Sequence, residues 1–144
     1  MALISIKGGT NKKRKRVYAV AHWAAYQLMH WKMADNIVLH IDIKKIDVCG
    51  YCGWEDDNIK PREFDIEINN NLIGVELDLT VLHEMVHVKQ YAKDEFRERF
   101  RFGYKLFWKR SKKNYAYLHD SLDSPWEKEA YNLQEVLYKR WIDE

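Results

Sequence analysis

His83, Glu84 and His87 form an HExxH motif, whose spacing can build most of a catalytic zinc site on one helix. Histidines four residues apart lie on the same face of an α-helix, about 6 Å apart, so their imidazole nitrogens can bind one metal ion. Glu84 directly follows the first histidine, where its carboxylate can accept a proton from a water molecule on the metal. The motif therefore predicts two zinc ligands and a general base.

The residues around this motif have the apolar spacing of an amphipathic helix. Leu79, Leu82 and Val86 recur every three or four residues, which places them on one buried face. Asp78 precedes most of this run, and we predict it as the N-cap of a helix over residues 78–91. Because short motifs also arise by chance, the alternative is a helix with two structural histidines, one hydrogen-bonded in the core and one solvated.

The rest of the chain divides into segments typical of helices and of strands. A run of helix formers without Gly or Pro predicts a first helix over residues 17–34. Segments that are β-branched or that alternate in polarity predict strands at 37–43, 46–54 and 64–69. Aromatic residues at helical spacing predict a helix over 94–110.

The last helix has the clearest start signal in the chain. Ser124 is suited to the N-cap, Pro125 to the first helical position and Glu127 to the third. The predicted class is α+β: an N-terminal helix, a small three-stranded sheet, the HExxH helix and two further helices.

Length and composition predict a single domain. The chain has 144 residues, of which 47% are hydrophobic, enough for one core. We assign residues 17–144 to this domain and residues 1–16 to a basic, flexible N-terminal segment. Basic residues concentrate at 12–16 and 89–113 although the net charge is only +2. Such clusters suit nucleic-acid binding, but a solvated helix face and a frayed terminus explain them equally simply.

Neither a membrane span nor a secretory signal is expected. The first apolar residues precede the basic ones, the reverse of a signal peptide, and no run approaches the roughly 18 apolar residues of a spanning helix. Cys49 and Cys52 form one CxxC motif without the further ligands that a structural zinc site needs. We therefore expect two reduced thiols and a cytoplasmic protein.

A catalytic zinc site usually has a third protein ligand, for which the residues after the HExxH motif offer several candidates. Glu127 and Glu129 each lie about 80° from the centre of the apolar stripe of the last helix, so the helical wheel does not separate them. Ser124 and Glu127 also match a capping box, in which the carboxylate bonds the Ser124 N–H, and this favours Glu129. His119 is a third candidate.

The HExxH motif together with Glu127-Lys128-Glu129-Ala130, an ExxA sequence on a later helix, resembles the gluzincin class of zinc metallopeptidases. The order of elements is similar to SprT-like and minimal gluzincin domains, which implies a zincin-like fold. In gluzincins the first Glu of ExxA is the third ligand, which implies Glu127. The chain lacks the third histidine that SprT-like domains generally use, and it lacks the Asn-Glu-x-x-Ser-Asp pattern of thermolysin-like enzymes.

These observations predict a zinc-dependent peptidase acting on peptide or protein substrates. Zn²⁺ is held by His83, His87 and Glu127, and Glu84 is the general base. Tyr131, one turn after Glu127, is the first candidate for stabilising the oxyanion. His119, Tyr117 and Tyr115 follow it, although each of these rings also suits simple packing. The strand at 64–69 is a candidate sheet edge where a peptide adds as a further strand. The alternatives are a zinc-binding domain without proteolysis and a nucleic-acid-associated protein.

Overall fold

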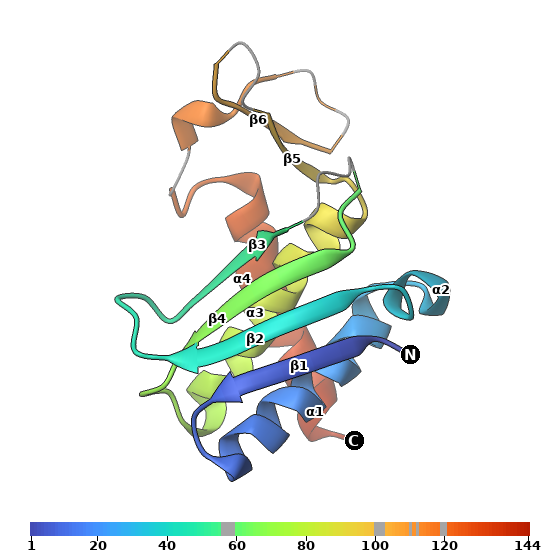
Figure 1. Ribbon diagram of the computed structural model, residues 1–144. Helices are drawn as coiled ribbons and strands as arrows, with labels where there is room; N and C mark the ends of the chain where they lie inside the picture. The colour runs from blue at the N-terminus through green and yellow to red at the C-terminus, as the bar shows by residue number, and fades with distance from the viewer. Residues whose placement is uncertain (56–59, 100–102, 110, 112, 119–120) are drawn as a thin grey trace.

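Four strands form the main sheet of the computed structural model, in the order β1-β2-β4-β3 (Figure 1). The structure describes residues 1–144 except 56–59, 100–102, 110, 112 and 119–120. The strands β1 (Leu3–Gly8), β2 (Val38–Lys44) and β4 (Glu63–Asn69) are parallel. Strand β3 (Gly50–Trp54) pairs antiparallel with β4 at the edge of the sheet. The predicted α+β class is confirmed, with four strands in this sheet rather than three.

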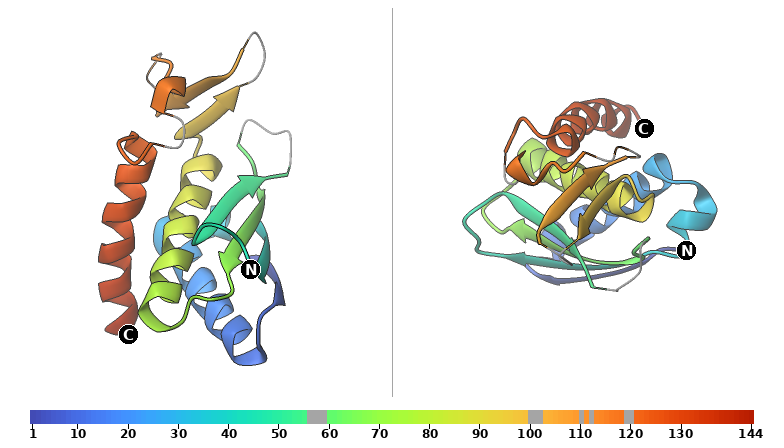
Figure 2. Two further views of the ribbon diagram at one scale, coloured as in Figure 1. Left: turned by 90° about the vertical axis from the view of Figure 1, so that its left-hand side faces the viewer. Right: turned by 90° about the horizontal axis from the view of Figure 1, so that it is seen from above.

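The helices form two further layers behind one face of the sheet. Alternation of side chains along β4 directs Phe64, Ile66 and Ile68 to this face, where they are buried, and directs acidic residues to the other face. Helices α1 (Asn11–Leu28) and α3 (Gly74–Ala92) cover the apolar face. Helix α4 (Pro125–Ile142) packs on α3, which therefore lies between the sheet and α4 (Figure 2).

The N-terminal residues are part of this architecture, which corrects the expected flexible segment over 1–16. β1 pairs with β2, and α1 begins at Asn11 rather than at residue 17, with Thr10 as the N-cap that accepts from the Lys13 N–H. The helix expected over 17–34 is divided into α1 and the short α2 (Trp31–Ala34). Strand β1 was not predicted, because the apolar residues at the N-terminus were considered only as a possible signal peptide.

Asp78 is not the N-cap of the HExxH helix. Helix α3 begins one turn earlier, at Gly74, and its N-cap Ile73 makes no side-chain cap bond. Asp78 is only 1% exposed, and its two carboxylate oxygens each accept a 2.7 Å hydrogen bond from Arg16 of α1. A bidentate pair of this kind joins the two helices that cover the sheet.

We expect the substitution Arg16→Met to destabilise the fold by roughly 2–3 kcal/mol, because it leaves the buried Asp78 carboxylate without its cation. Chemical denaturation with a circular dichroism readout measures the change. The matched control is Lys15→Met, which removes an exposed charge from the neighbouring position. Equal stability of the two variants would contradict a stabilising role for the pair.

The helix predicted over residues 94–110 is wrong. The described part of this segment contains a two-stranded sheet of β5 (Phe96–Arg99) and β6 (Lys105–Trp108), in which Phe96 lies opposite Trp108. Asp94 has a φ of 59°, a left-handed conformation that ends the helical path after α3. Aromatic residues at spacings of three and four produced the helical prediction, but aromatic side chains also pack against one another across paired strands.

The predicted start of the last helix is confirmed. Ser124 is the N-cap of α4, Pro125 occupies the first turn, and the Ser124 hydroxyl accepts from the Glu127 N–H at 3.4 Å. Trp126 is buried against Phe96 of the β5–β6 hairpin, with ring centroids 4.3 Å apart. At the other end of the helix, Trp141 packs against Trp23 of α1. These contacts hold the two ends of α4 against the β5–β6 hairpin and α1.

Candidate metal centre

Two helices bring three potential metal ligands together. His83 and His87 lie one turn apart on α3, and their Nε2 atoms are 3.2 Å apart. Glu127, in the first turn of α4, places Oε2 3.2 Å from the His83 Nε2 and Oε1 2.7 Å from the His87 Nε2. All three side chains are largely buried, being 11–22% exposed. The structure thus groups the three residues expected to bind zinc.

The spacing of these atoms suits a tetrahedral metal ion. Bond lengths of about 2.0–2.1 Å place two ligand atoms of a tetrahedral zinc site roughly 3.3 Å apart. The two Nε2 atoms are 3.2 Å apart, and each lies 2.7–3.2 Å from one of the two Glu127 carboxylate oxygens, close to this value. Two imidazole nitrogens and one carboxylate oxygen also form a donor set typical of catalytic zinc. These residues therefore fit the ion.

The other two candidates for the third ligand do not share this position. Glu129 binds the Lys89 ammonium at 2.6 Å and accepts from the Gln90 amide at 3.2 Å, so its carboxylate is already neutralised. His119 lies outside the described residues. The capping-box alternative for Glu127 is also not formed, because the Ser124 N–H donates to the Ser121 carbonyl and the Glu127 carboxylate contacts the histidines.

The charges of the cluster support one another. Burial alone would raise the pKa of Glu127, but hydrogen bonds with His83 and His87 outweigh it and lower that pKa to about 2. Burial lowers the pKa of His87, but its bond with Glu127 and the nearby Glu84 carboxylate reverse this effect and raise it overall. Both directions indicate a site that favours positive charge at its centre.

Glu84 lies next to the ligands on α3, on the side of this helix that faces β3. It is only 5% exposed, and burial raises the pKa of its carboxyl group against the opposing effect of the two histidines. Gly50 of β3 leaves room for it: a Cβ at residue 50 would lie 3.1 Å from the Glu84 Oε1 and 2.9 Å from Thr80 Cγ2. A desolvated carboxylate beside the ligand cluster has the properties of a general base.

We expect Gly50→Ala to reduce the peptidase activity predicted from the sequence severalfold without loss of the predicted metal, because the added methyl group displaces Glu84 and leaves His83 and His87 in place. Metal content and turnover measured on the same preparation test this separation. Gly53→Ala in the same strand is the comparison, since a Cβ there would meet the ring of Tyr51 instead. Unchanged turnover in the Gly50 variant would argue against the close packing of Glu84 on β3.

Tyr131 is the candidate oxyanion stabiliser that the structure places beside a ligand. Its ring centroid is 4.5 Å from that of His83, and the side chain is 46% exposed, so the ring is open to solvent on one side. Tyr115 packs against Trp126, and Tyr117 is 67% exposed beside Lys113. The last candidate, His119, is outside the described residues.

Two glutamines contact the histidines, and neither was predicted from the sequence. The His87 Nδ1 is 2.7 Å from Gln90 Oε1, and the His83 Nδ1 is 2.8 Å from Gln134 Oε1. Their spacing offers a signal: Gln90 follows His87 by three residues, and Gln134 follows Glu127 by seven, which in each case is the same helical face.

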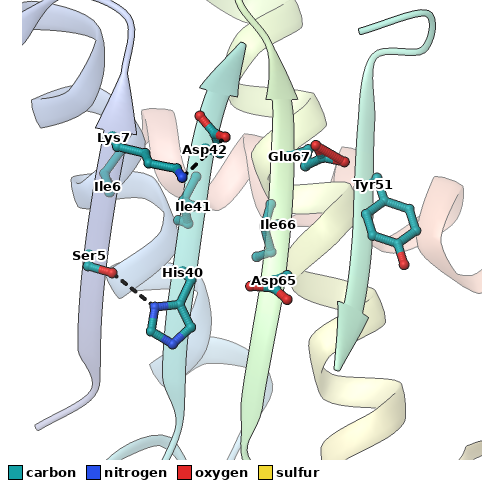
Figure 3. A pocket seen from close by; sticks show the side chains of 10 residues that line it. All are labelled: Ser5, Ile6, Lys7, His40, Ile41, Asp42, Tyr51, Asp65, Ile66 and Glu67. Carbon is teal, nitrogen blue, oxygen red and sulfur yellow. Dashed lines mark hydrogen bonds and ion pairs between the residues drawn. The ribbon is translucent and has the colours of Figure 1, made fainter. Parts of the chain in front are cut away.

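A hollow of about 650 Å³ on the opposite face of the sheet is separate from this centre (Figure 3). Near it, His40 lies 3.6 Å from carboxylate oxygens of both Glu55 and Glu63. These three side chains are 36–46% exposed, and exposed acidic groups are common without an ion. We therefore assign no metal to this group.

The remaining sequence features have simple structural accounts. Cys49 and Cys52 are free thiols. In the basic run at 12–16, Lys13 and Arg14 donate to backbone carbonyls and Arg16 pairs with Asp78, so the fold itself uses these side chains. Among the described helices, none has the length and apolarity to cross a membrane.

Comparisons with models of known protein families, with curated proteins and with solved structures found no match.

Proposed function

We propose that this protein is a zinc-dependent peptidase with a zincin-like fold of the gluzincin kind. The observation that carries the proposal is the meeting of His83, His87 and Glu127 at distances suited to zinc, with the buried Glu84 beside them. A purely structural pair of histidines would not require a carboxylate from a second helix or a general base at the same place.

Each residue of the site has a role in peptide hydrolysis. Bound zinc would polarise the scissile carbonyl and lower the pKa of a water molecule. Glu84 accepts a proton from this water as the oxygen forms a bond to the carbonyl carbon. When the carbon–nitrogen bond breaks, Glu84 returns the proton to the leaving amine. The exposed side of Tyr131 lets its hydroxyl approach the substrate, where it would donate to the developing oxyanion.

Strand β3 is the proposed docking edge for the substrate. The strand at 64–69 was predicted for this role, but β4 is paired on both sides, with β2 and β3. Strands β1 and β3 are the two edge strands of this sheet, and Gly50, the first residue of β3, adjoins Glu84. An extended peptide that pairs with β3 through its backbone would pass the general base with little demand on its side chains.

The test is zinc content and cleavage measured on the same purified protein. We expect one zinc per chain and hydrolysis of an unfolded protein such as casein, with activity lost on chelation and restored by added zinc. Stoichiometric zinc without cleavage of unfolded substrates would instead favour a metal-binding domain without proteolysis. Absence of zinc from protein refolded with excess zinc would refute the proposal.

A further inference from the structure

We propose that Gln90 and Gln134 are positioning residues that hold both ligand imidazoles in one tautomer, with Nδ1 protonated and Nε2 presented to the metal. The inference rests on the proposed function for the identity of the ion. It goes beyond the proposed ligands, because it assigns the orientation and protonation of the two histidines to two side-chain amides, Gln90 on α3 and Gln134 on α4.

The hydrogen bonds of Gln90 determine which end of its amide faces His87. Its Nε2 lies 2.9 Å from the Trp126 carbonyl oxygen and 3.2 Å from the Glu129 Oε1, and both of these atoms can only accept. The NH₂ group therefore points toward α4, and Oε1 points toward His87. Because an amide oxygen also only accepts, the His87 Nδ1 at 2.7 Å must carry the hydrogen.

Gln90 also joins two ligands from different helices. The side chain is fully buried, with 0% exposure, and it bonds the His87 ring at one end and the Trp126 carbonyl at the other. Trp126 directly precedes Glu127. One amide thus couples the orientation of the second ligand to the position of the helical turn that carries the third.

Gln134 has the corresponding role for His83. Its Oε1 is 2.8 Å from the His83 Nδ1, and its Nε2 lies toward Glu135 at 3.4 Å. Glu127, Tyr131 and Gln134 recur at helical spacing and therefore lie on one face of α4. From this face Glu127 supplies a ligand, Tyr131 packs its ring against His83, and Gln134 supplies the acceptor for the His83 imidazole.

This arrangement prepares the site before a metal arrives. With Nδ1 protonated, each neutral Nε2 directs its lone pair toward the other Nε2 and toward Glu127, within 3.2 Å, so without a metal ion a proton donated to Glu127 must hold these acceptors together. Such convergence of acceptors is favourable only around a cation. Acceptors for the second ring nitrogen are a general device for orienting metal-binding histidines, and their loss lowers metal affinity about 10–100-fold.

The decisive comparison uses three substitutions on α4. Gln134→Leu removes the acceptor for His83, Gln134→Glu keeps an acceptor, and Asn132→Leu replaces an exposed amide away from the site. Competition with a chromophoric chelator measures zinc affinity. We expect about 10–100-fold weaker binding for Gln134→Leu, and values close to wild type for the other two. Equal affinity of the two leucine variants would overturn the assignment.

A measurement on the metal-free protein separates positioning from general stability. Long-range ¹H–¹⁵N spectra of histidine-labelled protein distinguish the two neutral tautomers of each ring. We expect Nδ1–H for both ligands in the wild type and a change confined to His83 in Gln134→Leu. An Nε2–H tautomer in the wild type, or an unchanged His83 ring in the variant, would refute the inference.

The same measurement applies to Gln90. The substitution Gln90→Met has a similar volume and lacks both polar ends, so it should change the His87 ring and weaken zinc binding. If this buried substitution prevents folding, the Gln134 variants still decide the proposal. Wild-type protein that binds no zinc would contradict the proposed function, whereas the tautomers would still test the positioning role.

Discussion

Replacement of Glu84 by glutamine is expected to abolish peptide hydrolysis while the protein keeps its zinc. The amide has nearly the same shape as the carboxylate but cannot accept the proton of the attacking water. General acid–base catalysis by one side chain contributes about 10²–10⁴-fold to a rate, so turnover should fall by at least the lower figure. Parallel measurement of kcat and zinc stoichiometry tests both parts of the expectation.

The control for this experiment is Glu76→Gln, which makes the same chemical change at an exposed position of the same helix. It should retain wild-type activity. Full activity in the Glu84 variant would remove this residue from the role of general base, whatever the metal content. Loss of zinc together with activity would mean that Glu84 supports the site structurally.

The second large effect is expected at the ligands themselves. His83→Ala and Glu127→Gln should each lower zinc affinity by more than roughly 100-fold, the upper end of the loss seen for residues that only orient a ligand. His83 supplies a nitrogen of the cluster, and Glu127 supplies the only carboxylate that contacts both histidines within the described residues. Chelator competition on the folded, metal-free proteins measures both.

Glu129→Gln tests the choice between the two glutamates of α4. Its carboxylate pairs with Lys89, so this variant should lose stability but keep its zinc affinity. The opposite result, with zinc lost in Glu129→Gln and kept in Glu127→Gln, would show that the third ligand has been assigned to the wrong residue. Unchanged zinc content in His83→Ala would exclude that residue as a ligand.

Local signals in the sequence were enough for the elements that carry the site. HExxH within an apolar stripe predicted an active-site helix, and Ser124 followed by Pro125 located the start of α4. Strand β2 was predicted from its β-branched residues, and β4 from its alternation of apolar and acidic residues. In these segments the local preference for helix or strand agrees with the structure that packing in the fold requires.

Where the sequence failed, the deciding contacts came from distant residues. Aromatic spacing favoured a helix over 94–110, but pairing of Phe96 with Trp108 produced a hairpin instead. Asp is a preferred N-cap residue, yet Asp78 pairs with Arg16, which is 62 residues away. Residues 3–8 are a strand because β2 lies beside them.

Most residues of the proposed site could be predicted from the sequence. The two histidines and the proposed general base lie on one turn of a helix, and helical geometry fixes how such residues are placed relative to one another. The choice between Glu127 and Glu129 was not accessible from local geometry, since both lie equally far from the apolar stripe of α4, and only the resemblance to gluzincins favoured Glu127. Only the docking of α4 on α3 decided it, by directing Glu127 to the imidazoles and Glu129 to Lys89. The roles of Gln90 and Gln134 depend on the same contact between the two helices, which no local pattern specifies.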